Sequence, residues 1–265
     1  MSEFRILDYN YAFDPAVTIT ATTENANFPV SNLARFSRSR VWRSTSVAAV
    51  QRIVFDLRTI EEIDSFVVLF NPMQGEGVKF SEGAVIKLQA NATNVWSAPA
   101  VNVTLSIDEG YDVITHFFAT AQTYRYWALE MTDIGNAYGY LEIAKVILAN
   151  GTQLGQAPEI GFTDTLTDQS NVAETPYGHR YADVFPSRRR LEFNYSALAE
   201  DDIETLQNIF ARVGQVTPIA LALDPTATLF DKDRFFLYGY LSEKFQGTNR
   251  FYSYFDSGLS LVEAL

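Results

Sequence analysis

The residues best suited to chemistry are four arginines gathered around one tryptophan. Residues 35–43 read Arg-Phe-Ser-Arg-Ser-Arg-Val-Trp-Arg, the densest positive feature in a chain of 20 basic and 32 acidic residues. Because a guanidinium pairs with a carboxylate through two parallel hydrogen bonds, the cluster predicts binding of a carboxylate, an acidic sugar or an acidic neighbouring subunit. The alternative is internal, with the arginines stacked on the tryptophan and paired with nearby carboxylates. The candidate contact residues are Arg38, Arg40, Trp42 and Arg43.

Trp96 is a further candidate, because it lies in the polar segment 91–97, where a loop is predicted. An indole ring in a loop offers its face to a sugar ring, and exposed apolar surface can mark a binding site. A structural role is the alternative. Trp127 differs, since it falls in the strand-like run 126–130 and is predicted to pack in the core or on a sheet face.

Motifs for catalysis and metal binding are missing. The two histidines, His116 and His179, share no metal-ligand spacing, and His116 is predicted to be packed in an apolar strand. The sequence has no cysteine, no GxSxG nucleophile motif and no GxGxxG or GxxxxGKS phosphate loop. The acidic run 108–112 has calcium-ligand types without the spacing of a calcium loop. We therefore expect no catalytic residue, metal or cofactor, although a glycan hydrolase with two unmarked carboxylates remains an alternative.

Charge and hydropathy limit the classes of partner that this chain is expected to bind. The formal net charge is −12 and the sequence pI is about 4.6, so the field of the molecule repels polyanions and nucleic acid is not expected. No stretch approaches about 18 uninterrupted apolar residues, and the first residues lack a basic region followed by an apolar one. The sequence predicts neither a membrane span nor secretion through a signal peptide.

Short alternating runs separated by turn residues dominate the first half of the chain. Candidate strands lie at 17–22, 52–57, 65–70, 84–90, 112–119, 126–132 and 141–149. Alternation in 52–57 places Ile53, Phe55 and Leu57 on one face, the predicted core face. This number and spacing of strands predicts a sandwich or barrel.

Between about 150 and 176 the composition shifts to Gly, Pro, Asn and Thr, which predicts a linker or long crossover. We place a domain boundary near residue 155, giving a first domain of residues 1–155 and a second of residues 156–265. In the second domain, a helix from about 200 has apolar residues at helical spacing, acids in its first turn, and Gly214 as its stop.

Strands are predicted on both sides of this helix, including 178–184 and 189–195, so the second domain is expected to be a small β-barrel or sheet packed with one α-helix. The run Arg188–Arg190 opens one of these strands. It predicts either protection of a sheet edge or a salt bridge to another subunit.

Several segments, taken in order, resemble the discoidin-type, galactose-binding-like jelly roll. They are Asn27–Leu33, Arg38–Ser44, Gln51–Leu57, Ile63–Phe70, Tyr124–Glu130 and Tyr140–Leu148. The pattern Phe-Pro-Val-Ser-Asn-Leu followed by Ser-Arg-Val-Trp-Arg-Ser is also similar to tail-tip and baseplate structural proteins of phages and prophages. The family's usual flanking cysteines are missing, which fits assembly in a bacterial cytoplasm.

The second half resembles the β-barrel-plus-helix unit of tail-tube and distal-tail proteins, through an Arg-Leu-Glu-Phe-Asn-Tyr strand followed by the helix. This resemblance implies symmetric homo-oligomers formed by edge-strand pairing, in contact with tail tube, hub and fibre proteins. The leading hypothesis is a non-enzymatic structural protein of a bacteriophage tail tip or baseplate, located in the virion, that presents its jelly roll outward. The alternatives are a carbohydrate-binding module for adhesion to a host-surface glycan, and a glycan hydrolase.

Overall fold

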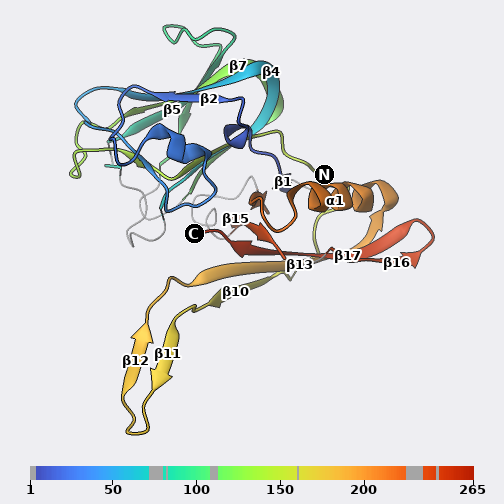
Figure 1. Ribbon diagram of the computed structural model, residues 1–265. Helices are drawn as coiled ribbons and strands as arrows, with labels where there is room; N and C mark the ends of the chain where they lie inside the picture. Colours follow the sequence, from blue (N-terminus) through green and yellow to red (C-terminus); the bar gives the residue numbers. More distant parts are fainter. Residues whose placement is uncertain are drawn as a thin grey trace.

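The computed structural model describes residues 4–71, 80–81, 83–107, 113–159, 161–224, 235–242 and 245–265. In these ranges the predicted fold class is confirmed, because the protein is mainly β and has a single α-helix. An N-terminal β-sandwich lies above a C-terminal sheet, the helix packs on that sheet, and a long hairpin projects away from both (Figure 1).

The N-terminal unit contains two short 3₁₀ turns, at Tyr11–Phe13 and Val30–Ala34. Its strands are β2 (Thr18–Ala21), β3 (Trp42–Arg43), β4 (Gln51–Leu69), β5 (Val85–Asn91), β6 (Val101–Leu105), β7 (Val113–Thr132), β8 (Glu142–Ile143) and β9 (Lys145–Ala149).

Two long strands build both layers of the sandwich. The sequence predicts separate strands at 52–57 and 65–70, and at 112–119 and 126–132, but each pair is one continuous strand, β4 of 19 residues and β7 of 20. The β4–β7 ladder shifts register after Asp56 and again after Ile63, and Arg58 adopts a φ of 67°. Such irregularities bend a strand, so β4 and β7 pass from one layer into the other.

The two layers differ in their partners. In the first layer, the early part of β4 and the late part of β7 pair with β2 and β5, and β6 follows β5. In the second layer, the late part of β4 pairs with β9 and with the early part of β7. The predicted core face is confirmed, since Ile53, Phe55 and Leu57 are buried between the layers together with Trp127.

The C-terminal unit contains β1 (Arg5–Leu7), β10 (Thr163–Thr167), β11 (Asn171–Glu174), β12 (Arg180–Asp183), β13 (Arg188–Ala199), α1 (Glu200–Val213), β14 (Ile219–Ala222), β15 (Phe236–Leu241), β16 (Gly247–Phe251) and β17 (Tyr254–Glu263). Its main sheet has the order β1-β14-β15-β17-β13-β10, and β16 adds to β17. The predicted helix is confirmed, with Ile203, Leu206, Ile209 and Val213 buried against the sheet and Gly214 at its end with a φ of 52°. Within the described ranges, no helix has the length and apolarity that crossing a membrane requires.

The predicted linker contains two strands, and the prediction of irregular structure there was wrong for most of residues 163–174. In this segment β10 pairs with β13, and β11 pairs with β12 across a tight turn. Cross-strand pairing overrides the polar composition. The domain boundary near residue 155 stays a prediction, and β1, from the other end of the chain, pairs with β14.

The second sandwich layer is buried on both sides, which joins the two units. Phe66 and Val68 of β4 face the sandwich core, whereas Val67 and Leu69 pack against the C-terminal sheet. On that sheet the contact is made by Ala220, Ala222, Phe236 and Tyr238. A strand covered on both faces needs apolar residues at every position rather than at every second one.

A buried lysine lies at the edge of this layer. The Nζ of Lys145 donates to the backbone oxygens of Asn32, Arg40 and Ala144 at 3.0, 2.8 and 2.7 Å. Burial away from water disfavours the charged amine, and the positive charge of Arg38 adds to this, so the pKa of Lys145 falls to about 7.

The lowered pKa predicts a pH dependence of stability. Between pH 7 and 10.5 the unfolded chain, with an ordinary lysine pKa, binds more protons than the folded chain, so stability rises with pH in this window. From pH 7 to 9, the free energy of unfolding of the wild type, measured by urea denaturation, is expected to rise by up to about 1.4 kcal/mol per pH unit more than that of Lys145→Met. Lys87→Met, at a partly exposed amine, is the control, and parallel wild-type and Lys145→Met profiles would contradict the prediction.

Candidate functional site

Arg38, the most buried arginine of the predicted contact residues, lies where the two units meet. Its Nε and Nη2 donate to the carbonyl oxygen of Phe70 at 3.1 and 2.7 Å, and its Nη1 lies 3.1 Å from Oε1 of Glu263. Glu263 also accepts the backbone N–H of Arg189 at 3.0 Å. Arg38 therefore binds a carboxylate of its own chain and links the sandwich to the C-terminal sheet.

Trp42 and Arg40 have opposite environments. Trp42 is fully buried in the sandwich core, and its Nε1 donates to the backbone oxygen of Thr23 at 3.2 Å. Arg40 is exposed, and its backbone oxygen accepts the Lys145 hydrogen bond. Of these two residues, only Arg40 presents its side chain to the surroundings.

Arg43 occupies a partly exposed aromatic site. Its Nε donates to Oε2 of Glu142 at 2.5 Å. Its guanidinium carbon lies 4.0 Å from the ring centroid of Phe28 and 4.7 Å from that of Tyr140. The arginine that follows Trp42 thus stacks on these two rings, and its charge is balanced within the chain.

The outer face of the first sandwich layer gathers charged and amide side chains beside Trp96. Arg52 of β4 and Lys87 of β5 are both in register with Glu130 of β7, which lies between them. Since their sequence neighbours point into the core, these side chains point outward. We term this surface the Trp96 face, and its residues are Arg52, Lys87, Gln89, Trp96, Asn102 and Glu130.

Two polar atoms of the Trp96 face have no partner within the described residues. The guanidinium carbon of Arg52 lies 5.8 Å from the Trp96 ring centroid, and its Nη2 pairs with Glu130, while its Nε is buried and unbonded. Oε1 of Gln89 is also buried and unbonded, although Nε2 of the same amide lies 3.4 Å from Asn102. A buried donor and a buried acceptor without partners are the kind of groups that ordered water or a ligand hydroxyl satisfies.

No set of three or more histidine, aspartate or glutamate side chains suited to a metal ion occurs among the described residues. The acidic run 108–112, considered for calcium, lies outside those residues. His116 packs edge-on against Phe118, with 4.5 Å between ring centroids, as a packed histidine should.

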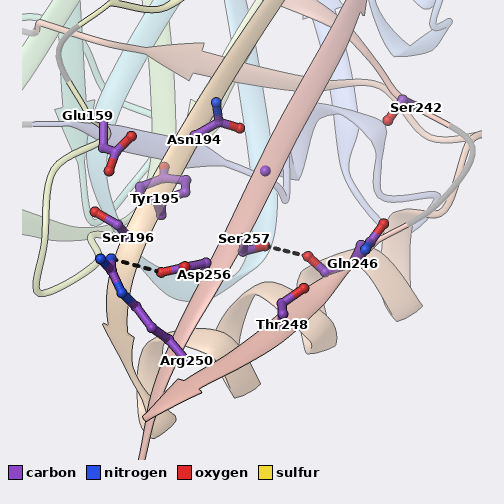
Figure 2. A pocket seen from close by; sticks show the side chains of 11 residues that line it. Glu159, Asn194, Tyr195, Ser196, Ser242, Gln246, Thr248, Arg250, Asp256 and Ser257 are labelled. Atoms are coloured by element: carbon purple, nitrogen blue, oxygen red, sulfur yellow. Dashed lines mark hydrogen bonds and ion pairs between the residues drawn. The ribbon is translucent and has the colours of Figure 1, made fainter.

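A polar hollow of about 690 Å³ lies on the face of the C-terminal sheet opposite α1 (Figure 2). Phe193 and Tyr195 of β13 point toward the helix, so Asn194 between them points into the hollow. Gly258 lies across from Asn194 on β17, and an added Cβ there would come within 3.1 Å of the Asn194 side chain. Arg250 and Asp256, 3.4 Å apart, line one part of the hollow, which therefore suits polar groups.

A second hollow of about 650 Å³ adjoins the first on the same face, and the two share Ser242. We term it the arginine-lined hollow, and its residues are Arg188, Arg190, Gln215, Tyr240, Leu241, Ser242 and Val262. Arg190 pairs with Glu192 at 2.6 Å, whereas Arg188 is exposed and has no carboxylate partner among the described residues. Burial raises the pKa of Tyr240, and the nearby charge of Arg188 opposes that rise.

These arginines do not protect a sheet edge. The run Arg188–Arg190 opens β13, which lies between β10 and β17 in the sheet. Edge protection, one of the two interpretations from the sequence, is therefore wrong for β13 as a strand, because β10 pairs along the whole run and β17 pairs from Arg190 onward. The subunit salt bridge stays a prediction.

A hairpin without internal support projects from the C-terminal sheet. We term residues 168–187 the arm; it contains β11 and β12, which pair only with each other in the described structure (Figure 1). Five large apolar side chains on it are 51–89% exposed, namely Val172, Tyr177, Tyr181, Val184 and Phe185. The arm was not predicted as a hairpin, although the turn residues Pro176 and Gly178 between two alternating runs are a hairpin signal.

No family model matches this chain, and no curated protein matches it. Among solved structures, it is similar to the family 32 carbohydrate-binding module of Clostridium perfringens NanJ in complex with galactose, with a TM-score of 0.43 and 16% identity over 56% of this chain and 99% of that one. It is also similar to a chitosan-binding module from a Paenibacillus chitosanase/glucanase, with a TM-score of 0.41 and 19% identity over 54% of this chain and 99% of that one. A third similar structure is a Ruminococcus gnavus GH29 fucosidase in complex with fucose, with a TM-score of 0.45 and 10% identity over 56% of this chain and 28% of that one. These TM-scores are low, so the fold of this chain is described from its own strand pairing.

The buried link at Arg38 predicts a large loss of stability on substitution. Arg38→Met is expected to lower the free energy of unfolding by about 3–5 kcal/mol, because Glu263 and the Phe70 carbonyl lose a buried charged partner. Arg40→Met, at an exposed position of the same cluster, is the control and should change it by less than about 0.5 kcal/mol. Urea denaturation measures both, and equal small effects would show that the link is dispensable.

Proposed function

We propose that this chain is a non-enzymatic structural protein that assembles into a symmetric homo-oligomer through its C-terminal unit, as a component of a bacteriophage tail tip or baseplate. The arm is the observation that carries the proposal. The jelly roll and the arm lie at opposite ends of the molecule (Figure 1), so a ring built through the C-terminal units leaves the jelly rolls free to face outward.

The arm is built for contact rather than for independent stability. A two-stranded hairpin is marginally stable by itself in water. Here it also leaves five large apolar side chains in water, each of which would gain about 1.5–3 kcal/mol from full burial. A protein partner that covers the arm would supply this stabilisation.

The placement in a phage tail depends on the sequence. Both halves resemble tail proteins, and the order strand, helix, strand of the second half is retained in β13, α1 and β14. In such a particle the partners are tail tube, hub and fibre proteins, and assembly takes place in the bacterial cytoplasm. The chain carries no nucleophile or phosphate-loop motif, which favours a structural role over catalysis.

Removal of the arm is expected to abolish self-association. The wild type should form a multiple of 29.8 kDa in solution, whereas replacing residues 168–187 with an Asn-Gly turn should leave a folded monomer. Light scattering after gel filtration measures both masses. Control substitutions Val50→Ser and Ile60→Ser, at exposed apolar positions of the sandwich, should leave the wild-type mass unchanged. A monomeric wild type, or an arm-deleted protein that still assembles, would contradict self-association through the arm.

The tail placement has its own readout. In a phage that carries this gene, virions with the Asn-Gly replacement should lack normal tail tips in negative-stain images and lose infectivity. Normal, infectious particles would exclude the tail role even if the purified protein oligomerises.

Saccharide binding by the Trp96 face is a second candidate function. Trp96 offers an aromatic face, and the surface beside it holds a guanidinium, an amine, two amides and a carboxylate. The unbonded Nε of Arg52 is a free donor and the unbonded Oε1 of Gln89 a free acceptor, and sugar hydroxyls can pair with groups of either kind. This observation favours a hydroxyl-rich ligand at the first sandwich layer.

Trp96→Ala tests this second function. On a glycan array, the wild type should bind a subset of glycans, and the variant should lose at least about tenfold in affinity because an aromatic platform is removed. Tyr138→Ala, at a 47% exposed aromatic residue of the same unit, is the matched control and should bind as the wild type does. A flat response of the wild type to all glycans, or equal binding by Trp96→Ala, would exclude the Trp96 face as a sugar site.

A further inference from the structure

We infer that the arm of one copy docks in the arginine-lined hollow of a second copy, with Asp183 of the arm facing Arg188 of the hollow. This inference rests on the proposed self-association and names the surface that receives the arm. The occupant is the same chain, and the contact is repeated from copy to copy.

Charge complementarity is the first argument. The arm carries three acidic residues and one arginine, whereas the hollow contributes Arg188 and Arg190. Glu174 and Arg180 of the arm lie 4.0 Å apart, so each has an opposite charge nearby. Asp183 has no cationic partner among the described residues, and Arg188 has no carboxylate partner there, so the two unpaired charges of opposite sign lie on the arm and in the hollow.

The side-chain pattern of the arm is the second argument. In the β11–β12 ladder Ala173 is opposite Tyr181, and Asn171 is opposite Asp183. Since residues two apart on a strand share a face, Tyr181 and Asp183 lie on one face of the arm. That face presents an aromatic ring next to a carboxylate. The hollow offers guanidinium groups together with the apolar and aromatic surface of Val262 and Tyr240, which suits both.

The arm cannot bring this face to the hollow of its own chain in the described conformation. Asp183 lies five positions before Arg188, a span of roughly 17 Å when extended, and the arm points away from the sheet (Figure 1). The contact therefore joins different copies. Because the arm and the hollow are different surfaces, each copy gives one arm and receives another, an arrangement that closes as a ring when the rotation between copies allows it.

Charge reversal tests the pairing in the full-length chain. Asp183→Arg and Arg188→Glu should each weaken self-association by about tenfold or more, because each places like charges opposite one another. The chain that carries both substitutions should regain most of the wild-type assembly. Sedimentation velocity over a concentration series measures the dissociation constants, and circular dichroism confirms that each variant is folded.

Mixing the two single variants separates a contact between copies from one within a chain. In an equimolar mixture, the arm of the Asp183→Arg chain meets the hollow of the Arg188→Glu chain with opposite charges facing each other. The unsubstituted arm of the Arg188→Glu chain likewise meets the unsubstituted hollow of the Asp183→Arg chain, so assembly should be stronger in the mixture than for either variant alone. A pairing within one chain would be rescued by the double substitution and not by mixing. Arg35→Glu, at an exposed arginine of the sandwich, is the control and should assemble normally.

The outcomes distinguish this inference from the proposed function. A wild-type protein that stays monomeric would overturn both. A wild type that assembles, with no effect of either charge reversal or no rescue on mixing, would overturn the docking of the arm in the arginine-lined hollow and leave self-association standing.

Discussion

A sheet layer buried on both sides holds this molecule together. The late part of β4 and all of β9 are covered by the sandwich core on one side and by β14 and β15 on the other. Neither unit completes its packing without this layer, because its two faces belong to two different cores. The sandwich and the C-terminal sheet therefore form one framework, in contrast to domains that meet only through a flexible linker.

At the ends of this buried layer, backbone carbonyls need hydrogen-bond donors, and two buried basic side chains supply them. Arg38 donates to the carbonyl of Phe70 just beyond the end of β4, and Lys145, at the start of β9, donates to the carbonyls of Asn32, Arg40 and Ala144. Taking the Arg38 charge out of water costs free energy that its hydrogen bonds only partly return. Their benefit lies in orientation, because Arg38 joins the sandwich to Glu263 and so fixes how the two units face each other. For the arginine cluster the sequence left ligand binding and internal pairing open, and Arg38 and Arg43 pair with carboxylates of their own chain.

The sequence predicted the parts whose signal is local. The helix at α1, the core face of Ile53 and Phe55, and the burial of Trp127 follow from periodicity and composition alone. The parts that depend on distant partners were missed: the continuity of β4 and β7 through their bends, and strands in the polar segment that the ladder with β13 stabilises. The candidate site residues were the hardest to predict. Nothing local distinguishes buried Arg38 from exposed Arg40, and the two unbonded atoms of the Trp96 face come from two separate strands, β4 and β5.

The pairing of β1 with β14 has a mechanical meaning. Strand β1 enters the C-terminal sheet before the jelly roll begins, and Thr152, just after the jelly roll, forms a bridge with Ile6 of the same strand. The jelly roll is thereby tethered to one sheet at both of its ends. A force pulling on this unit is shared by two segments of chain. The unit therefore cannot rotate freely, as a domain attached through one flexible linker can. A force that acts on the sandwich therefore reaches the C-terminal sheet through two connections.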